Sequence, residues 1–133
     1  MADELPPYAD APRVGTVFSD VPRVIRAASL PDAELPAAPL DPDQVVSGDP
    51  EVRLLEIHDA ADLGIGIWQH GVGVSTDTEV DEVFVVLSGR ATIEVEGGPA
   101  LEVGPGDVGL YPAGTRTRWT VHEPLRKIYV VRP

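Results

Sequence analysis

Glu82-Val-Phe-Val-Val-Leu-Ser-Gly89 and Gly104-Pro-Gly-Asp107 followed by Tyr111-Pro-Ala-Gly114 are the stretches that decide the fold of this chain. The continuous apolar run 83–87 predicts a strand that is covered on both faces. The glycine- and proline-containing segments after it are typical of turns between short strands. The two stretches therefore predict strand–turn units of one β-sheet domain.

The sequence around these stretches continues the same pattern. Short apolar segments separated by turn residues predict strands at 52–57, 63–70, 80–87, 91–96, 100–103, 108–111, 115–121 and 127–131. Many short strands with closely spaced turns favour an all-β sandwich or barrel. An outer layer over 83–87 would come from the N-terminal segment or from a partner chain.

The N-terminal part has a different character, because nine of the 14 prolines lie in residues 1–62. Proline fixes φ and removes a backbone donor, so this part predicts an extended arm rather than a helical domain. We assign residues 1–50 to a proline-rich arm that packs on the barrel or on a partner subunit, and residues 51–133 to the barrel. Within the arm, the apolar runs 14–18 and 21–25 are candidate edge strands, and residues around 31–35 form a candidate short helix.

Composition excludes several classes of function. The formal net charge of -12 argues against nucleic acid and anionic membranes, which bind cationic surfaces. The chain has no cysteine, so disulfides, thiolate metal sites and a cysteine nucleophile are excluded. No apolar run is long enough to span a membrane, and the acidic N-terminus lacks the pattern of a signal peptide, so a cytoplasmic protein is expected.

The spacing of the deciding stretches resembles a known family. Glu82, separated by six residues from the turn glycine Gly89, and Gly106 with Pro112 and Gly114, resemble the two motifs of cupins. Together with 64–68, 78–79, Trp119 and 126–129, they are similar to small single-domain cupins of the RmlC-like superfamily, in the DUF861 group. Its relatives include ethanolamine-utilisation and ureidoglycine aminohydrolase-like cupins, and most have no assigned function. The resemblance implies a double-stranded β-helix, or jelly-roll, barrel and a homodimer.

The same resemblance implies where a metal would bind. A metal-binding cupin would carry histidines at Thr76, Thr78 and Thr117 and its glutamate at Glu82. Only Glu82 is a good ligand here, because threonine hydroxyls bind zinc, iron and manganese poorly. We therefore predict no metal site and no cofactor, and leave open a weakly held divalent cation at Glu82.

Strand alternation predicts the lining of the barrel. An inward Glu82 places Thr76, Thr78 and Phe84 on the same face, and an inward Thr117 places Trp119 beside it. The predicted ligand-binding residues are Trp68, Thr76, Thr78, Phe84, Tyr111, Thr117 and Trp119, a lining that suits a small polar metabolite.

Three functions stay open at this point. The first is a protein that binds such a metabolite without a metal cage. The second is an isomerase, lyase or hydrolase in which Glu82, paired with His70, acts as the acid–base group. The third is a structural dimerisation domain whose lumen is filled by side chains.

Overall fold

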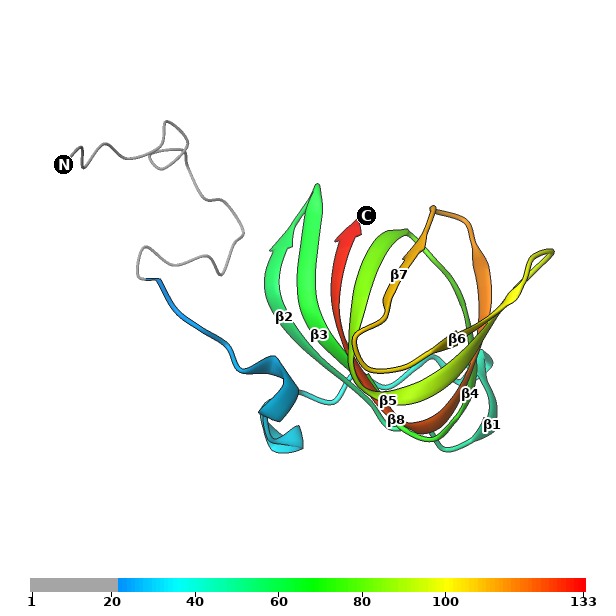
Figure 1. The fold of residues 1–133 in the computed structure, drawn as a ribbon, viewed down its shortest axis with the longest axis horizontal. Coiled ribbons are helices and arrows are strands. Elements are labelled where there is room, and N and C mark those ends of the chain that lie inside the picture. The colour runs from blue at the N-terminus through cyan, green and yellow to red at the C-terminus, as the bar shows by residue number, and fades with distance from the viewer. Residues whose placement is uncertain (1–21) are drawn as a thin grey trace.

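The computed structural model describes residues 22–133, and nearly all of them outside the N-terminal segment belong to one curled antiparallel sheet (Figure 1). The strands are β1 (Val45–Gly48), β2 (Val52–Ala60), β3 (Leu63–His70), β4 (Gly73–Thr78), β5 (Asp81–Val95), β6 (Ala100–Val103), β7 (Val108–Tyr111) and β8 (Arg116–Arg132). The prediction of an all-β barrel is confirmed.

The long strand β8 organises the sheet. Its N-terminal half pairs with β4 and its C-terminal half with β3, while β5 pairs with it along both halves. The resulting order is β1-β4-β8-β3-β2, and β5 also carries β6 and β7. Figure 1 shows these strands wrapping around a common interior.

Two pairs of predicted strands are each one long, bent strand in the structure. Residues 80–87 and 91–96 merge into β5, and 115–121 and 127–131 merge into β8. Register shifts between Val86 and Ala91 bend β5 and change which residues point inward. Phe84 and Val86 are buried before this bulge, whereas Ala91 and Ile93 are buried after it.

Within residues 22–44, the structure has three short 3-10 helices, η2 (Ala27–Ser29), η3 (Asp32–Glu34) and η4 (Pro42–Gln44). The candidate helix around 31–35 is therefore a single 3-10 turn, and residues 22–25 of the candidate strand 21–25 form no strand. The candidate strand 14–18 lies outside the described residues. β1 lies within the predicted arm yet pairs with β4 of the barrel. Within residues 22–133, no helix has the length and apolar character needed to cross a membrane.

Arg126 of β8 connects this segment to the outside of the barrel through hydrogen bonds. Its guanidinium donates to the carbonyls of Ala27 at 2.9 Å and Leu30 at 2.8 Å, and to Asp32 Oδ1 at 3.0 Å. Ala27 and Leu35 pack on Ile67 and on neighbouring apolar side chains of the outer face. The segment therefore supplies part of the outer layer that the apolar run in β5 predicts.

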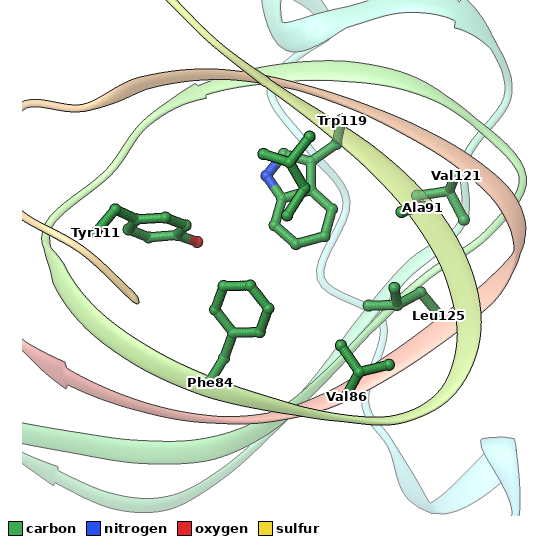
Figure 2. Packing of buried hydrophobic residues seen from close by; sticks show 8 residues of the cluster. Phe84, Val86, Ala91, Tyr111, Trp119, Val121 and Leu125 are labelled. Atoms are coloured by element: carbon green, nitrogen blue, oxygen red, sulfur yellow. The ribbon is translucent and has the colours of Figure 1, made fainter. Parts of the chain in front are cut away.

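The inner face of the barrel forms the main core. It contains Phe84, Val86, Ala91, Ile93, Tyr111, Trp119, Val121 and Leu125, which come from β5, β7 and β8 (Figure 2). Trp68, Val103 and Tyr129 pack against this cluster. The polar groups of the lumen lie directly beside this cluster, because Lys127 contacts the Phe84 and Trp119 rings.

Candidate ligand site in the barrel lumen

A buried ion pair lies at the centre of the lumen. Lys127 Nζ donates to Glu82 Oε2 at 2.7 Å, and the two side chains are only 6% and 10% exposed. Glu82 points inward from β5, and Lys127 points inward from β8, where it pairs across the sheet with Val86. Burial of both charges is tolerable because each compensates the other.

Three aromatic rings surround the ammonium of Lys127. Its Nζ lies 4.6 Å from the ring centroids of Trp68 and Phe84 and 4.9 Å from that of Trp119. The negative faces of aromatic rings attract a cation at such distances. The rings also pack on one another, with centroids 5.5 Å apart for Trp68 and Trp119. The cation is therefore held in a fixed place by β3, β5 and β8 together.

A cavity of about 210 Å³ adjoins this ion pair. Its polar lining consists of Gln44, Ser75, Thr76, Asp77, Glu79, Glu82 and Lys127, and its apolar lining of Leu40, Leu54, Trp68, Trp119, Tyr129 and Val131. The N-terminal segment contributes to its wall, because Gln44 Nε2 donates to the Thr76 carbonyl at 3.1 Å. The cavity is small and combines apolar walls with a few fixed polar groups, as ligand sites do.

Glu79 is a second buried carboxyl in this lining. It is 8% exposed, and its burial raises its pKa to about 7, with the neighbouring Asp77 adding to the effect and Tyr111 and Lys127 opposing it. The side chain therefore changes its protonation state near neutral pH. Such a group can both donate and accept a proton under physiological conditions.

Tyr111 lies beside both carboxyls. Burial, together with the charges of Glu82 and Glu79, raises the pKa of its hydroxyl, which therefore stays protonated. Figure 2 shows this hydroxyl pointing into the barrel toward Phe84 and Trp119. Within residues 22–133, Tyr111 Oη and Thr117 Oγ1 are the buried side-chain polar atoms without a hydrogen-bond partner of ordinary geometry. Buried polar atoms of this kind call for a bound water or ligand.

His70 is fully buried and points inward, but it does not pair with Glu82. Its Nδ1 lies 2.6 Å from the Gly71 carbonyl, and its Nε2 lies 2.8 Å from Ser75 Oγ. The carbonyl can only accept, so Nδ1 carries the proton and Nε2 accepts from the serine hydroxyl. Burial and the nearby Lys127 charge lower the pKa of His70, so the ring is neutral. The geometry assigns His70 to holding the start of β4 in place.

The structure differs from the prediction that Thr76 and Thr78 point into the lumen. They pair across the sheet with Arg118 and Arg116, whose side chains are exposed, whereas Ser75 and Asp77 pair with the buried Trp119 and Thr117. Opposite residues of an antiparallel pair share a face, so the side chains of Thr76 and Thr78 point outward, although Thr76 still borders the cavity. The inward–outward alternation of side chains in β5 does not extend into β4, because the two strands are separated by Glu79 and Val80.

The remaining predicted residues lie where strand alternation places them. Trp68, Phe84, Thr117 and Trp119 face the lumen, and Tyr111 lies inside it rather than on the rim. The predictions missed Lys127 and Glu79. Lys127 lies beyond the turn residues at His122–Leu125, so the alternation from Thr117 and Trp119 could not be carried to it until the structure showed one continuous strand. The position of Glu79 depends on the break after β4, which no sequence pattern marks.

The lining does not fit the metal cage that the cupin resemblance implies. Within the part of the chain that the structure describes, no group of three or more histidine, aspartate or glutamate side chains converges to hold a metal ion. At the position of the metal-binding glutamate, Glu82 contacts the ammonium of Lys127 instead. A cation that belongs to the protein therefore lies against this carboxylate.

Comparison with known proteins identifies the family. The model of the EutQ-like cupin domain matches residues 61–129, which is more than half of the chain. The chain belongs to this family. No curated protein matches the sequence. This cupin is also similar to solved structures of the fold.

A putative ethanolamine utilization protein, EutQ, from Salmonella typhimurium is 24% identical, with a TM-score of 0.55 over 62% of this chain and 70% of that one. EutQ from Clostridium difficile is 23% identical, with a TM-score of 0.57 over 63% and 64%. A protein of unknown function of the DUF861 family from Pseudomonas syringae is 27% identical, with a TM-score of 0.65 over 73% and 43%. The cupin thus spans less than two thirds of the latter two proteins, and the likeness to the EutQ proteins shows the fold alone.

The proton on Glu79 leads to a prediction for stability. The folded protein keeps this proton up to about pH 7, whereas the unfolded chain loses it near 4.5. Between these values the folded state binds more protons, so the contribution of Glu79 to stability is largest at low pH and falls as the pH rises. Glu79→Gln should remove this loss and gain about 3 kcal/mol relative to wild type between pH 4.5 and 8.

Urea denaturation of both proteins across this pH range measures the effect. Glu94→Gln is the matched control, because Glu94 is an exposed glutamate on the outer face of the barrel. Parallel stability curves for wild type and Glu79→Gln would show that the Glu79 carboxyl titrates normally.

Proposed function

We propose that this cupin binds a small polar metabolite in the barrel lumen without a histidine metal cage. The observation that carries the proposal is the cavity of about 210 Å³ beside the buried Glu82–Lys127 pair. A lumen filled by side chains, as a purely structural domain would have, leaves no such space. Apolar ring faces together with fixed charges favour a compound with a short carbon skeleton and a few polar groups.

A thermal-shift screen tests the proposal. Wild-type protein is heated with a panel of small amines, hydroxy acids, oxo acids and ureido compounds, and a ligand that binds only the folded state raises Tm. A lumen ligand should raise the Tm of wild type and of Glu94→Gln but have a smaller effect on Glu79→Gln, which changes the cavity lining. Equal shifts in all three proteins would place the ligand outside the lumen and contradict the proposal.

A second candidate function is acid–base catalysis, and one observation favours it. Glu79 lines the cavity and has a pKa of about 7, which is where proton transfer to and from a substrate is most efficient at neutral pH. Glu82 is bonded to Lys127 and His70 to Ser75, so the two do not form the expected acid–base pair, and Glu79 is the candidate for this second function. Any turnover found should follow pH with a midpoint near 7 and be lost in Glu79→Gln. Full activity in that variant would reject this function.

We also propose that the chain forms a homodimer. Val83, Leu110 and Val130 are neighbours on the outer face of β5, β7 and β8, and they are 41%, 68% and 40% exposed. Apolar side chains that gather on a sheet face favour association. Light scattering tests the proposal, and a monomer at micromolar concentration would contradict it.

A further inference from the structure

Lys127 is the only lysine of the 133-residue sequence, and the other nine positively charged residues are arginines. Within residues 22–133, no arginine lines the cavity beside Lys127. Lysine and arginine differ in chemistry, because an arginine is always charged whereas a lysine can lose its proton and react as an amine. The one position in the sequence that uses lysine is thus buried against the cavity.

We propose that Lys127 is a nucleophilic amine that forms an imine with a small aldehyde or ketone bound in the lumen. The inference rests on the proposed lumen site and names its ligand class. Lys127 lines the cavity, so a bound carbonyl compound would reach its amine directly. Nucleophiles of this kind are activated by desolvation or by an adjacent general base, and Lys127 is buried among aromatic rings with the Glu82 carboxylate beside it.

Glu82 is placed to move the proton that the step requires. Lys127 gives one ammonium proton to the Glu82 carboxylate 2.7 Å away, and the free amine attacks the carbonyl carbon. The C–N bond forms as the carbonyl π bond opens, and one proton of the attacking nitrogen passes to the carbonyl oxygen, which becomes a hydroxyl. Glu82 then returns its proton to this hydroxyl, which leaves as water. Ammonium and carbonyl compound thus become protonated imine and water, the total charge is unchanged, and no oxidant or reductant is needed.

The surroundings of Lys127 suit the product as well as the starting amine. The protonated imine carries its positive charge at the same nitrogen, which lies 4.6 Å from the Trp68 and Phe84 rings and beside Glu82. These rings and this carboxylate attract either cation. The step therefore proceeds without the burial of an uncompensated charge.

Reductive trapping tests the inference. The full chain is incubated with glyoxylate, pyruvate or glycolaldehyde and sodium cyanoborohydride, which reduces an imine to a stable secondary amine. The chain has two amines, the N-terminus and Lys127, and cleavage after arginine separates them into residues 1–13 and 127–133. Mass spectrometry of the two peptides then assigns every adduct.

We expect at least one probe to label residues 127–133 roughly tenfold or more faster than it labels Nα-acetyl-lysine in the same solution. Glu82→Gln should slow this labelling, and Lys127→Arg should abolish it while labelling of residues 1–13 persists. The comparison with Nα-acetyl-lysine uses the wild-type chain alone, so it remains decisive even where a variant fails to fold.

Labelling of Lys127 no faster than that of Nα-acetyl-lysine with all three probes would overturn the inference. A compound that raises Tm through the lumen but is never trapped would support the proposed binding function and overturn the imine. Failure of the binding function itself would appear separately, as the absence of any lumen-dependent shift in Tm.

Discussion

Gly89→Ala is expected to lower the free energy of unfolding by about 4 kcal/mol, the upper end of single-residue effects. Gly89 has φ +85, where an L-residue is strained by about 1–2 kcal/mol. An alanine Cβ would also lie 2.1 Å from the Pro124 carbonyl oxygen and 2.6 Å from Leu125 Cα. Both contacts are with the backbone of β8, so relief requires β5 and β8 to separate at their shared bend.

Gly106→Ala is the matched control for this prediction. Gly106 has φ +88, and a Cβ there would meet no atom within 4 Å. It therefore reports the backbone strain alone, which should cost about 1–2 kcal/mol. Urea denaturation of both variants gives the difference. Equal losses would show that the close approach of β5 and β8 at Gly89 contributes nothing.

Lys127→Met is expected to lower the free energy of unfolding by about 3–5 kcal/mol at pH 8, because it leaves the Glu82 carboxylate buried without its partner. The double variant Lys127→Met/Glu82→Leu should recover most of this loss, since it removes both charges and leaves apolar side chains among the rings. The non-additivity of the double-mutant cycle measures the coupling between the two residues.

The exposed pair Arg118–Glu94 provides the comparison for this cycle. Its Nε–Oε2 distance is 3.7 Å, and its side chains are 52% and 56% exposed. Breaking it with Arg118→Met should cost less than about 1 kcal/mol. If Lys127→Met lowers the free energy of unfolding by a similarly small amount, and its effect adds to that of Glu82→Leu, the Glu82–Lys127 pair is exposed to solvent in solution.

The ion pair changes what the lumen of this cupin can do. The cupin resemblance implies a metal ligand at Glu82, but the cation beside this carboxylate is the Lys127 ammonium. A lysine ammonium offers a single charge and three hydrogen-bond donors, whereas a metal ion would offer open coordination positions. Chemistry in this lumen therefore depends on hydrogen bonds, proton transfer and the amine itself.

Most of the fold is predictable from the sequence because turn chemistry and alternation are local. The turn residues at Gly104–Asp107 and Pro112–Gly114 separate strands where they are expected. The sequence does not predict that β5 continues through Ser88–Arg90 and β8 through His122–Leu125. Both segments contain turn residues, but in the structure the two strands bend together there and remain paired.

The site is less predictable than the fold, because a shift of one residue changes the face to which a side chain belongs. Phe84, Thr117 and Trp119 lie on strands with clear apolar alternation, and the prediction that they face inward is confirmed by their burial. The segment Ser75–Glu79 is polar at every position, so its sequence carries no alternation to fix the inward face. Its register comes from pairing with β8, and this pairing selects Ser75 and Asp77 over Thr76 and Thr78.

We propose that the lumen is an open ligand site built around the Glu82–Lys127 pair rather than around a metal. A high-resolution crystal structure of the full chain, with anomalous diffraction data, tests it most directly. We predict Lys127 Nζ within hydrogen-bond distance of Glu82 and electron density of solvent or an organic ligand in the adjoining cavity. An anomalous scatterer bound to Glu82 with Lys127 displaced from it, or a cavity filled by side chains, would contradict the claim.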